Sequence, residues 1–150
     1  TFSESLKRGD SKKVLYDGEY YHIRRYGYTY KKVKYYFVES HDFFDYDRVY
    51  GLKNDVDRFA FFNKVVVEML DDLEPFDLIH INDWHTSLIP LLIDNSPHKN
   101  TKTLLTIHNI DYQGIAKNSV IKKLGIKNFI FRDENINFLE IVVIYKLALN

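Results

Sequence analysis

The stretch FDLIHINDWHTSLIPLLI (residues 76–93) joins a short apolar run, a polar turn and a second apolar segment. The run FDLIHI predicts a strand over 77–81 that is buried on both faces. TSLIPLLIDN predicts a helix over 86–95, with its proline in the first turns, where a missing N–H costs little. KTLLTIH then predicts a second buried strand over 102–107. These elements form one strand–helix–strand unit, whose right-handed crossover makes the two strands parallel.

The segments on either side extend this α/β pattern. Residues 54–73 predict the clearest helix, capped by Asn54 or Asp55 and ended by Pro75. Its helically spaced apolar positions are Phe59, Phe62, Val66, Met69, Leu70 and Leu73. Upstream, GEYYHIRRYGY and KKVKYYFVES predict an aromatic-rich antiparallel hairpin that turns near residues 29–32. Polar residues 1–13 predict a loosely ordered connection, and residues 135–149 predict a closing helix.

The composition excludes several classes of protein. The 150 residues suit one domain, and 21 basic side chains balance 21 acidic ones, so no net charge attracts nucleic acid or an anionic membrane. Basic residues in the predicted hairpin are therefore expected to be solvated strand faces; they are Arg24, Arg25, Lys31, Lys32 and Lys34. The chain has no cysteine and no apolar run near the ~20 residues of a membrane span. These features indicate a soluble, intracellular protein.

Polar side chains follow both predicted parallel strands. Asp83 and His85 lie in the turn that leaves the first strand, and His108 and Asn109 follow the second. Ligands of open parallel sheets bind beyond the carboxyl ends of the strands, so we expect Asp83, His85 and His108 to converge on one rim. The N-terminus of the predicted helix over 86–95 faces the same rim and favours an anion or a polar ligand there.

The same residues allow other interpretations. His80, Asp83 and His85 carry ligand types that suit Zn²⁺ or Fe²⁺, and a metallohydrolase is an alternative. His80 lies within the strand and is expected to be a buried structural histidine. Asp83 is equally expected to cap the following helix or to face the pocket. Trp84 is expected to anchor packing over the turn. No G-x-S-x-G motif is present, which argues against a serine hydrolase.

Three segments of the chain together resemble one family. FDLIHINDWHTSLIPLLI followed by KTLLTIHNIDYQG is similar to the N-terminal domain of bacterial glycogen synthases and plant starch synthases. That family carries D-W-H-x-x-L-x-P and then T-hydrophobic-H-N-x-x-Y-Q-G. The upstream stretch YFVESHDFFDYDRVYGLKNDVDRFAFF resembles the same family, which has an aromatic strand, then Y-G, then D-x-x-R-F-A-F-F. The resemblance covers about residues 33–139.

The resemblance implies a retaining glucosyltransferase of the double-Rossmann type. Such enzymes extend α-1,4-glucan, as glycogen or starch, from ADP-glucose or UDP-glucose, with no cofactor or metal. By motif match, His108 and Asp83 would be catalytic, whereas Asn109, His85 and Tyr50 would bind substrate. Gln113 and Gly114 would have structural roles. The expected partners are the nucleotide-sugar and the glucan acceptor, without nucleic acid or membrane, in bacterial cytoplasm or a plastid.

The match also predicts an incomplete domain. Residues 1–150 would form one incomplete N-terminal domain, a partial Rossmann-like sheet preceded by the hairpin, with a family-like core at about 33–139. The K-x-G-G phosphate loop of the family is not found, and its C-terminal nucleotide-binding domain would be absent. We therefore expect this stretch alone to be inactive. The main alternative is a stand-alone sugar- or glucan-binding module without catalysis, and the metallohydrolase comes after it.

Overall fold

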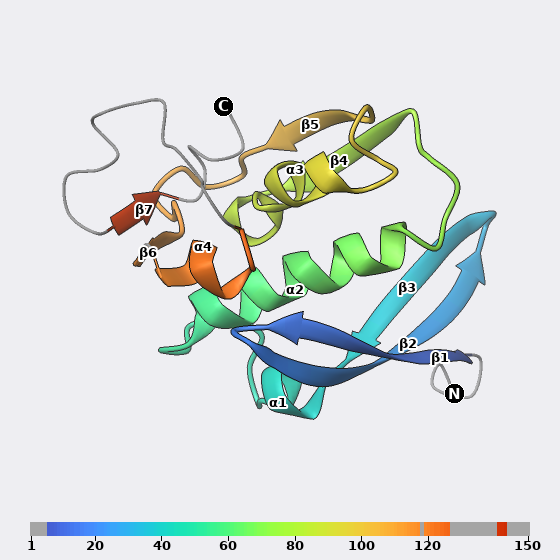
Figure 1. The fold of residues 1–150 in the computed structure, drawn as a ribbon. Helices are drawn as coiled ribbons and strands as arrows, with labels where there is room; N and C mark the ends of the chain where they lie inside the picture. Colours follow the sequence, from blue (N-terminus) through green and yellow to red (C-terminus); the bar gives the residue numbers. More distant parts are fainter. Residues whose placement is uncertain (1–5, 118, 127–140, 144–150) are drawn as a thin grey trace.

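The computed structural model describes residues 6–117, 119–126 and 141–143. Helix α2 (Asp55–Leu70) lies between two sheets (Figure 1). Antiparallel sheet A packs on one side of the helix, and parallel sheet B with helix α3 packs on the other (Figure 1). The α/β class predicted from the sequence is confirmed.

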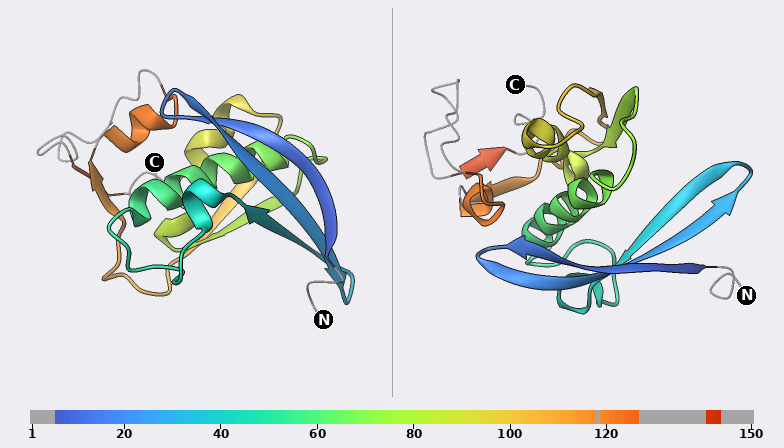
Figure 2. Two further views of the ribbon diagram at one scale, coloured as in Figure 1. Left: turned by 90° about the horizontal axis from the view of Figure 1, so that it is seen from below. Right: turned by 45° about the vertical axis from the view of Figure 1, so that its right-hand side comes forward.

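Sheet A contains the predicted hairpin and one further strand. Strands β2 (Glu19–Tyr30) and β3 (Val33–Glu39) pair antiparallel around the turn at Lys31 and Lys32. Strand β1 (Lys7–Tyr16) pairs with β2, so the prediction of a loose connection over residues 1–13 is wrong for the described part. Main-chain hydrogen bonds to β2 hold β1 in place. Most of its side chains are polar, and only Val14 and Tyr16, near the turn into β2, are buried in the core. The far end of the β2–β3 hairpin extends away from the body (Figure 2).

Helix α2 is buried on more sides than its apolar spacing indicated. Phe61 and Val65 are fully buried, whereas Phe59, Phe62, Val66 and Leu70 of the predicted core face are only partly buried. The predicted burial of Met69 is confirmed. The single-face prediction is wrong because layers cover the helix on two sides. Helix α1 (His41–Phe44) precedes it, and the Phe43 ring stacks on Phe61 at a centroid distance of 3.8 Å.

Sheet B confirms the parallel pair but not its burial on both faces. Strands β4 (Leu78–Asn82) and β5 (Lys102–Thr106) are parallel neighbours. Ile81 is buried toward α2 and α3. On the other face, Leu78 and Leu104 keep 47% and 49% of their surface exposed. The prediction fails because helices among the described residues cover only one face of this pair.

The helix predicted over 86–95 is broken into three short pieces. They are a 3₁₀ turn η2 (Trp84–Thr86), helix α3 (Ile89–Leu92) and a 3₁₀ turn η3 (Ile93–Asn95). The Thr86 hydroxyl donates to the Asn82 carbonyl at 2.8 Å, and the Ser87 hydroxyl donates to the Asp83 carbonyl at 2.7 Å. These side-chain bonds hold a tight turn between β4 and α3, and the pieces that follow are too short to present a long helix dipole to the rim.

The remaining described elements are short. Strand β6 (Ile115–Lys117) pairs antiparallel with β7 (Ile141–Val143), and helix α4 (Ser119–Lys123) follows β6. The predicted helix over 135–149 is wrong at 141–143, and the rest of it lies outside the described residues. Among the helices of the described residues, none has both the length and the apolar character that crossing a membrane requires.

One polar cluster joins sheet A, α2 and α4. The Tyr16 hydroxyl donates to the Asp57 carboxylate at 3.0 Å, and the Lys123 ammonium donates to the same oxygen at 2.8 Å. Burial, followed by the nearby Asp57 carboxylate, raises the pKa of Tyr16, so its hydroxyl stays a donor. The Asp57 hydrogen bond raises the pKa of Lys123.

Asn63 connects α2 to the turn that follows β4. This residue is fully buried, and its amide nitrogen donates to the carbonyls of Phe59 and His85, both at 2.6 Å. Its amide oxygen accepts from the Leu88 N–H at 3.1 Å. One side chain therefore satisfies a carbonyl within the 3₁₀ turn and an N–H just after it.

We expect Asn63→Leu to lower the free energy of unfolding by about 2–4 kcal/mol, because buried donors and acceptors lose their partners. Urea unfolding at neutral pH measures this change. Lys64→Leu is the matched control on the same helical turn, since its partly exposed pair with Glu68 contributes little. Equal effects of the two substitutions would contradict this role of Asn63.

Candidate functional site

Asp83 has an unusual backbone at the carboxyl end of β4. Its φ of 55° and ψ of 179° lie in a region that L-residues rarely occupy. Three main-chain contacts hold it there: its N–H donates to the Thr106 carbonyl at 2.9 Å, and its carbonyl accepts from the Thr86 N–H and the Ser87 hydroxyl. Strain that is held in this way concentrates at functional sites.

The Asp83 carboxylate joins the ends of the two parallel strands. Its Oδ1 atom accepts from the His108 N–H at 2.8 Å. The ring of His108 reaches back, with Nε2 lying 3.0 Å from the Asn82 amide oxygen. Because that amide oxygen only accepts, Nε2 is the donor in this contact, and the rest of the ring belongs to an exposed residue. The structure thus brings Asp83 and His108 together, as the strand order predicted.

His85 lies on the helix side of the same turn. Its ring packs edge-on against Phe59 at 4.4 Å between centroids and lies 4.3 Å from the Trp84 ring. Burial lowers the pKa of His85, and the carboxylates of Asp83 and Asp55 oppose that shift. The ring is therefore neutral at pH 7 and forms part of an aromatic wall beside the Asp83–His108 pair.

The other two predicted contact residues are more open. Asn109 is exposed, and its Oδ1 atom accepts from the Asp111 N–H at 3.0 Å. Its side-chain amide therefore points back toward the loop that contains it. Tyr50 keeps 71% of its surface exposed in the loop between α1 and α2.

The geometry does not favour the metal-binding interpretation. His80 is exposed rather than buried, because it points to the uncovered face of sheet B, where its Nε2 lies 2.7 Å from the Thr106 hydroxyl. In the described parts of the chain, no three His, Asp or Glu side chains come together in a way that could hold a metal ion. The capping role considered for Asp83 is also wrong, since its carboxylate bonds His108 rather than the 3₁₀ turn.

Trp84 and Gly114 form the structural support of the turn. Trp84 keeps 8% of its surface exposed and packs edge-on against Phe59, as predicted for an anchor. Gly114 has a φ of +66°, and a Cβ atom there would lie 2.6 Å from the Trp84 ring. Only glycine allows the chain after β5 to cross the indole so closely.

Sequence reasoning left out two residues that shape the site. The Asn82 amide orients the His108 ring, and Asn63 fixes the turn from α2. Asn82 could have been found from strand alternation, since it is the last residue of β4. The sequence gives no comparable indication for Asn63. A polar residue within a predicted helix is expected to face solvent, and only the three-dimensional structure shows that Asn63 is buried.

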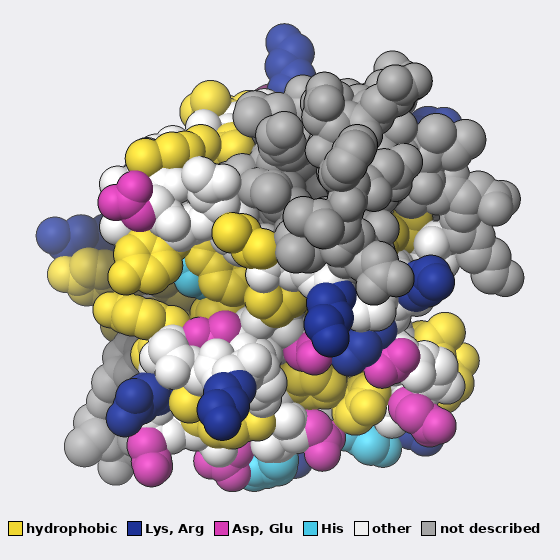
Figure 3. Space-filling model, turned by 90° about the vertical axis from the view of Figure 1, so that its left-hand side faces the viewer, with side chains coloured by type: hydrophobic (Ala, Val, Ile, Leu, Met, Phe, Trp, Pro, Cys, Tyr) yellow, Lys and Arg dark blue, Asp and Glu magenta, His cyan; other side chains and the backbone are white. Residues whose placement is uncertain are grey.

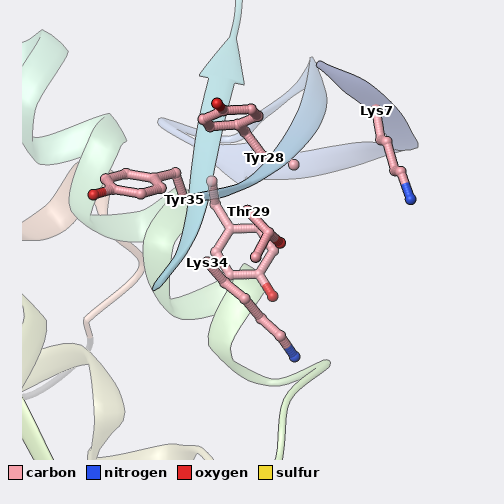
Figure 4. Close-up of a pocket in the computed structure, with 7 residues that line it drawn as sticks. Lys7, Tyr28, Thr29, Lys34 and Tyr35 are labelled. Carbon is pink, nitrogen blue, oxygen red and sulfur yellow. The ribbon is translucent and has the colours of Figure 1, made fainter. Parts of the chain in front are cut away.

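A separate hollow of about 350 Å³ lies on sheet A at the base of the protruding hairpin end. Figure 4 shows Lys7, Thr29 and Lys34 on one side of this hairpin, with the rings of Tyr28 and Tyr35 on the other. Elsewhere on sheet A, Arg24 pairs with Glu39 at 3.1 Å. Basic and acidic side chains are also mixed over the face drawn in Figure 3, in keeping with the balanced composition.

Comparisons with known proteins place this fold in a class and then in a family. The fold matches a glycosyltransferase catalytic domain, that of starch synthase IV from Arabidopsis thaliana, solved with ADP and acarbose bound. The TM-score is 0.83 at 25% identity, over 96% of this chain and 32% of that one. The family model of the starch synthase catalytic domain matches residues 3–150, a longer stretch than 33–139. The chain belongs to this family, which confirms the resemblance seen in its motifs.

Curated relatives agree with this assignment. The glycogen synthase of Finegoldia magna is 30% identical over 139 residues, which cover 89% of this chain and 29% of that protein. The glycogen synthase of Caldicellulosiruptor bescii is 36% identical over 121 residues, or 76% of this chain and 25% of that protein. The chain thus spans less than a third of the length of these relatives.

We expect Gly114→Ala to destabilise the protein by about 2–5 kcal/mol, because a left-handed backbone and a steric overlap with Trp84 add together. Gly125→Ala is the matched control: its φ is +76°, but nothing lies within 4 Å of the added Cβ. That variant should lose only about 1–2 kcal/mol. Chemical denaturation of both variants checks the difference, and equal losses would show that the indole contact is unimportant.

The lowered pKa of His85 predicts a dependence of stability on pH. The unfolded chain binds a proton at this residue more readily than the folded chain does. Its stabilising contribution is therefore complete above the ordinary pKa of 6.5 and is lost as the pH falls through the lowered value. Urea unfolding between about pH 7.5 and about pH 5 should show a shallower loss for His85→Phe than for the wild type. Parallel curves would contradict this expectation.

Proposed function

We propose that this chain forms the sugar-binding wall of the catalytic cleft in a retaining glucosyltransferase. The enzyme would extend α-1,4-glucan, using ADP-glucose or UDP-glucose as the donor. The observation that carries this proposal is the hydrogen-bonded pair of Asp83 and His108 at the carboxyl edge of the parallel strands. Family membership and the fold match support the same reaction class.

Asp83 and His108 have properties that suit glucose recognition. Sugar hydroxyls need both donors and acceptors, and the exposed His108 ring has one nitrogen free to bond a hydroxyl while Asn82 holds the other. The Asp83 carboxylate accepts from the His108 N–H, and carboxylate oxygens are the acceptors that sugar hydroxyls bond. Held in this orientation, the pair would fix the transferred glucose and stabilise the transition state without reorganising.

His85, Asn109 and Tyr50 would contact the substrates around this pair. The neutral His85 ring, packed on Phe59 and Trp84, would present one edge to a sugar. Tyr50 would supply an exposed ring for the glucan acceptor, and Asn109 would supply an amide beside His108. Aromatic rings with a polar end suit sugars, which have both apolar faces and hydroxyl edges.

Positive charge at the donor diphosphate would come from a second, C-terminal domain. The rim residues Asp83, His108 and Asn109 suit sugar hydroxyls and supply no fixed cation. The starch synthase of matching fold carries ADP together with acarbose, and this chain covers 32% of it. We therefore expect the 150 residues alone to bind glucan weakly without transferring glucose.

We expect His108→Ala to lower kcat for glucose transfer by about 10²–10³-fold in the enzyme that contains both domains, because a preorganised contact to the reacting sugar is lost. Asp83→Gly should relieve the backbone strain and still lose activity, since the carboxylate is removed. His80→Ala, on the uncovered face of β4, is the control and should retain activity. Transfer of labelled glucose to a maltooligosaccharide measures all three.

Full activity of the His108→Ala enzyme would remove the main site assignment. Binding of maltooligosaccharide by an enzyme that never transfers glucose from either donor would instead indicate a glucan-binding module. Circular dichroism of each variant separates a lost contact from a lost fold.

A further inference from the structure

The loop between α1 and α2 carries Tyr50 but has little packing of its own. Every residue from 45 to 51 is exposed. Behind the loop lies a hollow of about 290 Å³, with Tyr46 and Val49 on the loop side and Phe59 and Phe62 on the helix side. The side chains of the loop and of α2 therefore leave space between them, and polar contacts take a larger part in holding the loop.

Arg58 on α2 supplies one set of anchors instead. Its side chain is 6% exposed, its Nε donates to the Phe43 carbonyl at 2.8 Å, and its Nη1 lies 3.3 Å from the Val49 carbonyl. The guanidinium also lies over the Tyr46 ring, 4.7 Å from the centroid. One planar group thus holds both ends of the loop.

Asp55 supplies a second set of anchors from the first turn of α2, and the Asn54 amide donates to the Tyr46 hydroxyl at 2.8 Å. The Asp55 Oδ2 atom accepts from the Gly51 N–H at 2.6 Å and from the Leu52 N–H at 3.0 Å. Its Oδ1 atom accepts from Arg58 at 2.8 Å. The carboxylate and the guanidinium therefore act as one unit that holds the main chain on both sides of Tyr50.

We infer that the Arg58–Asp55 ion pair positions the loop that presents Tyr50 to the glucan acceptor. The inference rests on the proposed function and adds a positioning pair to it. Neither residue of the pair touches substrate; both act through the Tyr50 loop.

The position of the pair on α2 fits this role. Phe59 follows Arg58 directly and packs against the His85 ring at the edge of the site. Burial lowers the pKa of His85, and the negative charge of Asp55 partly offsets this larger effect. The same helix turn therefore holds the acceptor loop on one side and the wall of the sugar site on the other. A shift of the loop would move Tyr50, whereas Asp83 and His108 are held by their own hydrogen bonds at the strand ends.

The test compares Arg58→Lys with the wild type in glucose transfer to maltooligosaccharide. Lysine keeps the charge but cannot reach the Phe43 and Val49 carbonyls and the Asp55 carboxylate together. We expect KM for the glucan to rise about tenfold. Both kcat and KM for the nucleotide-sugar should stay within about twofold. Arg24→Lys, in the Arg24–Glu39 pair of sheet A, is the matched control and should change neither constant.

A double-mutant cycle with Tyr50→Ala separates positioning from general destabilisation. If Arg58 acts through Tyr50, Arg58→Lys should have little further effect on KM once the ring is removed. Asp55→Asn weakens the same anchors without changing size, and it gives the same measurement should Arg58→Lys not fold.

Four results would overturn the inference. An unchanged glucan KM in folded Arg58→Lys or Asp55→Asn would overturn this inference. If the wild type still transfers glucose, the proposed function would stand. Additive effects in the cycle, or failure of both variants to fold, would leave the pair a purely structural role. A wild-type enzyme that neither binds nor extends glucan would remove the proposed function and the inference with it.

Discussion

The backbone of Asp83 is the constraint on which the site depends. A residue held at φ 55° and ψ 179° costs about 1–3 kcal/mol, and it persists because hydrogen bonds from β5 and the 3₁₀ turn over-determine it. That conformation aims the carboxylate sideways at the His108 N–H instead of along the chain at a helix terminus. The carboxyl ends of β4 and β5 are thereby joined, and this is the edge of a parallel sheet beyond which ligands bind.

Helix α2 gives this arrangement its rigidity through buried polar groups as much as through apolar packing. Asn63 bonds the turn that carries His85, and nearer the start of the same helix Arg58 and Asp55 bond the loop that carries Tyr50. A buried polar group without its hydrogen-bond partner destabilises the folded state. Each of these bonds therefore fixes one position of the loop, whereas apolar contacts alone would allow several. The two sides of the proposed sugar site are in this way held by a single helix.

Local patterns predicted the elements whose determinants are close in sequence. The antiparallel hairpin, helix α2, the parallel pair and the Trp84 anchor are examples, because strand and helix periods and turn residues are read within a few positions. Predictions failed where a distant neighbour decides. The polar residues of β1 form a strand because β2, which follows it in the chain, supplies their hydrogen bonds.

The sequence by itself determined the α/β class, the parallel order of β4 and β5, and the family to which the chain belongs. It also determined that Asp83 and His108 meet, since both follow neighbouring parallel strands. Only the tertiary structure decided how they meet, which face of each element is buried, and that Asn63, Arg58 and Asp55 hold the surrounding loops. The reason is physical: side-chain hydrogen bonds across the fold depend on distances between elements, and no local sequence pattern encodes those distances.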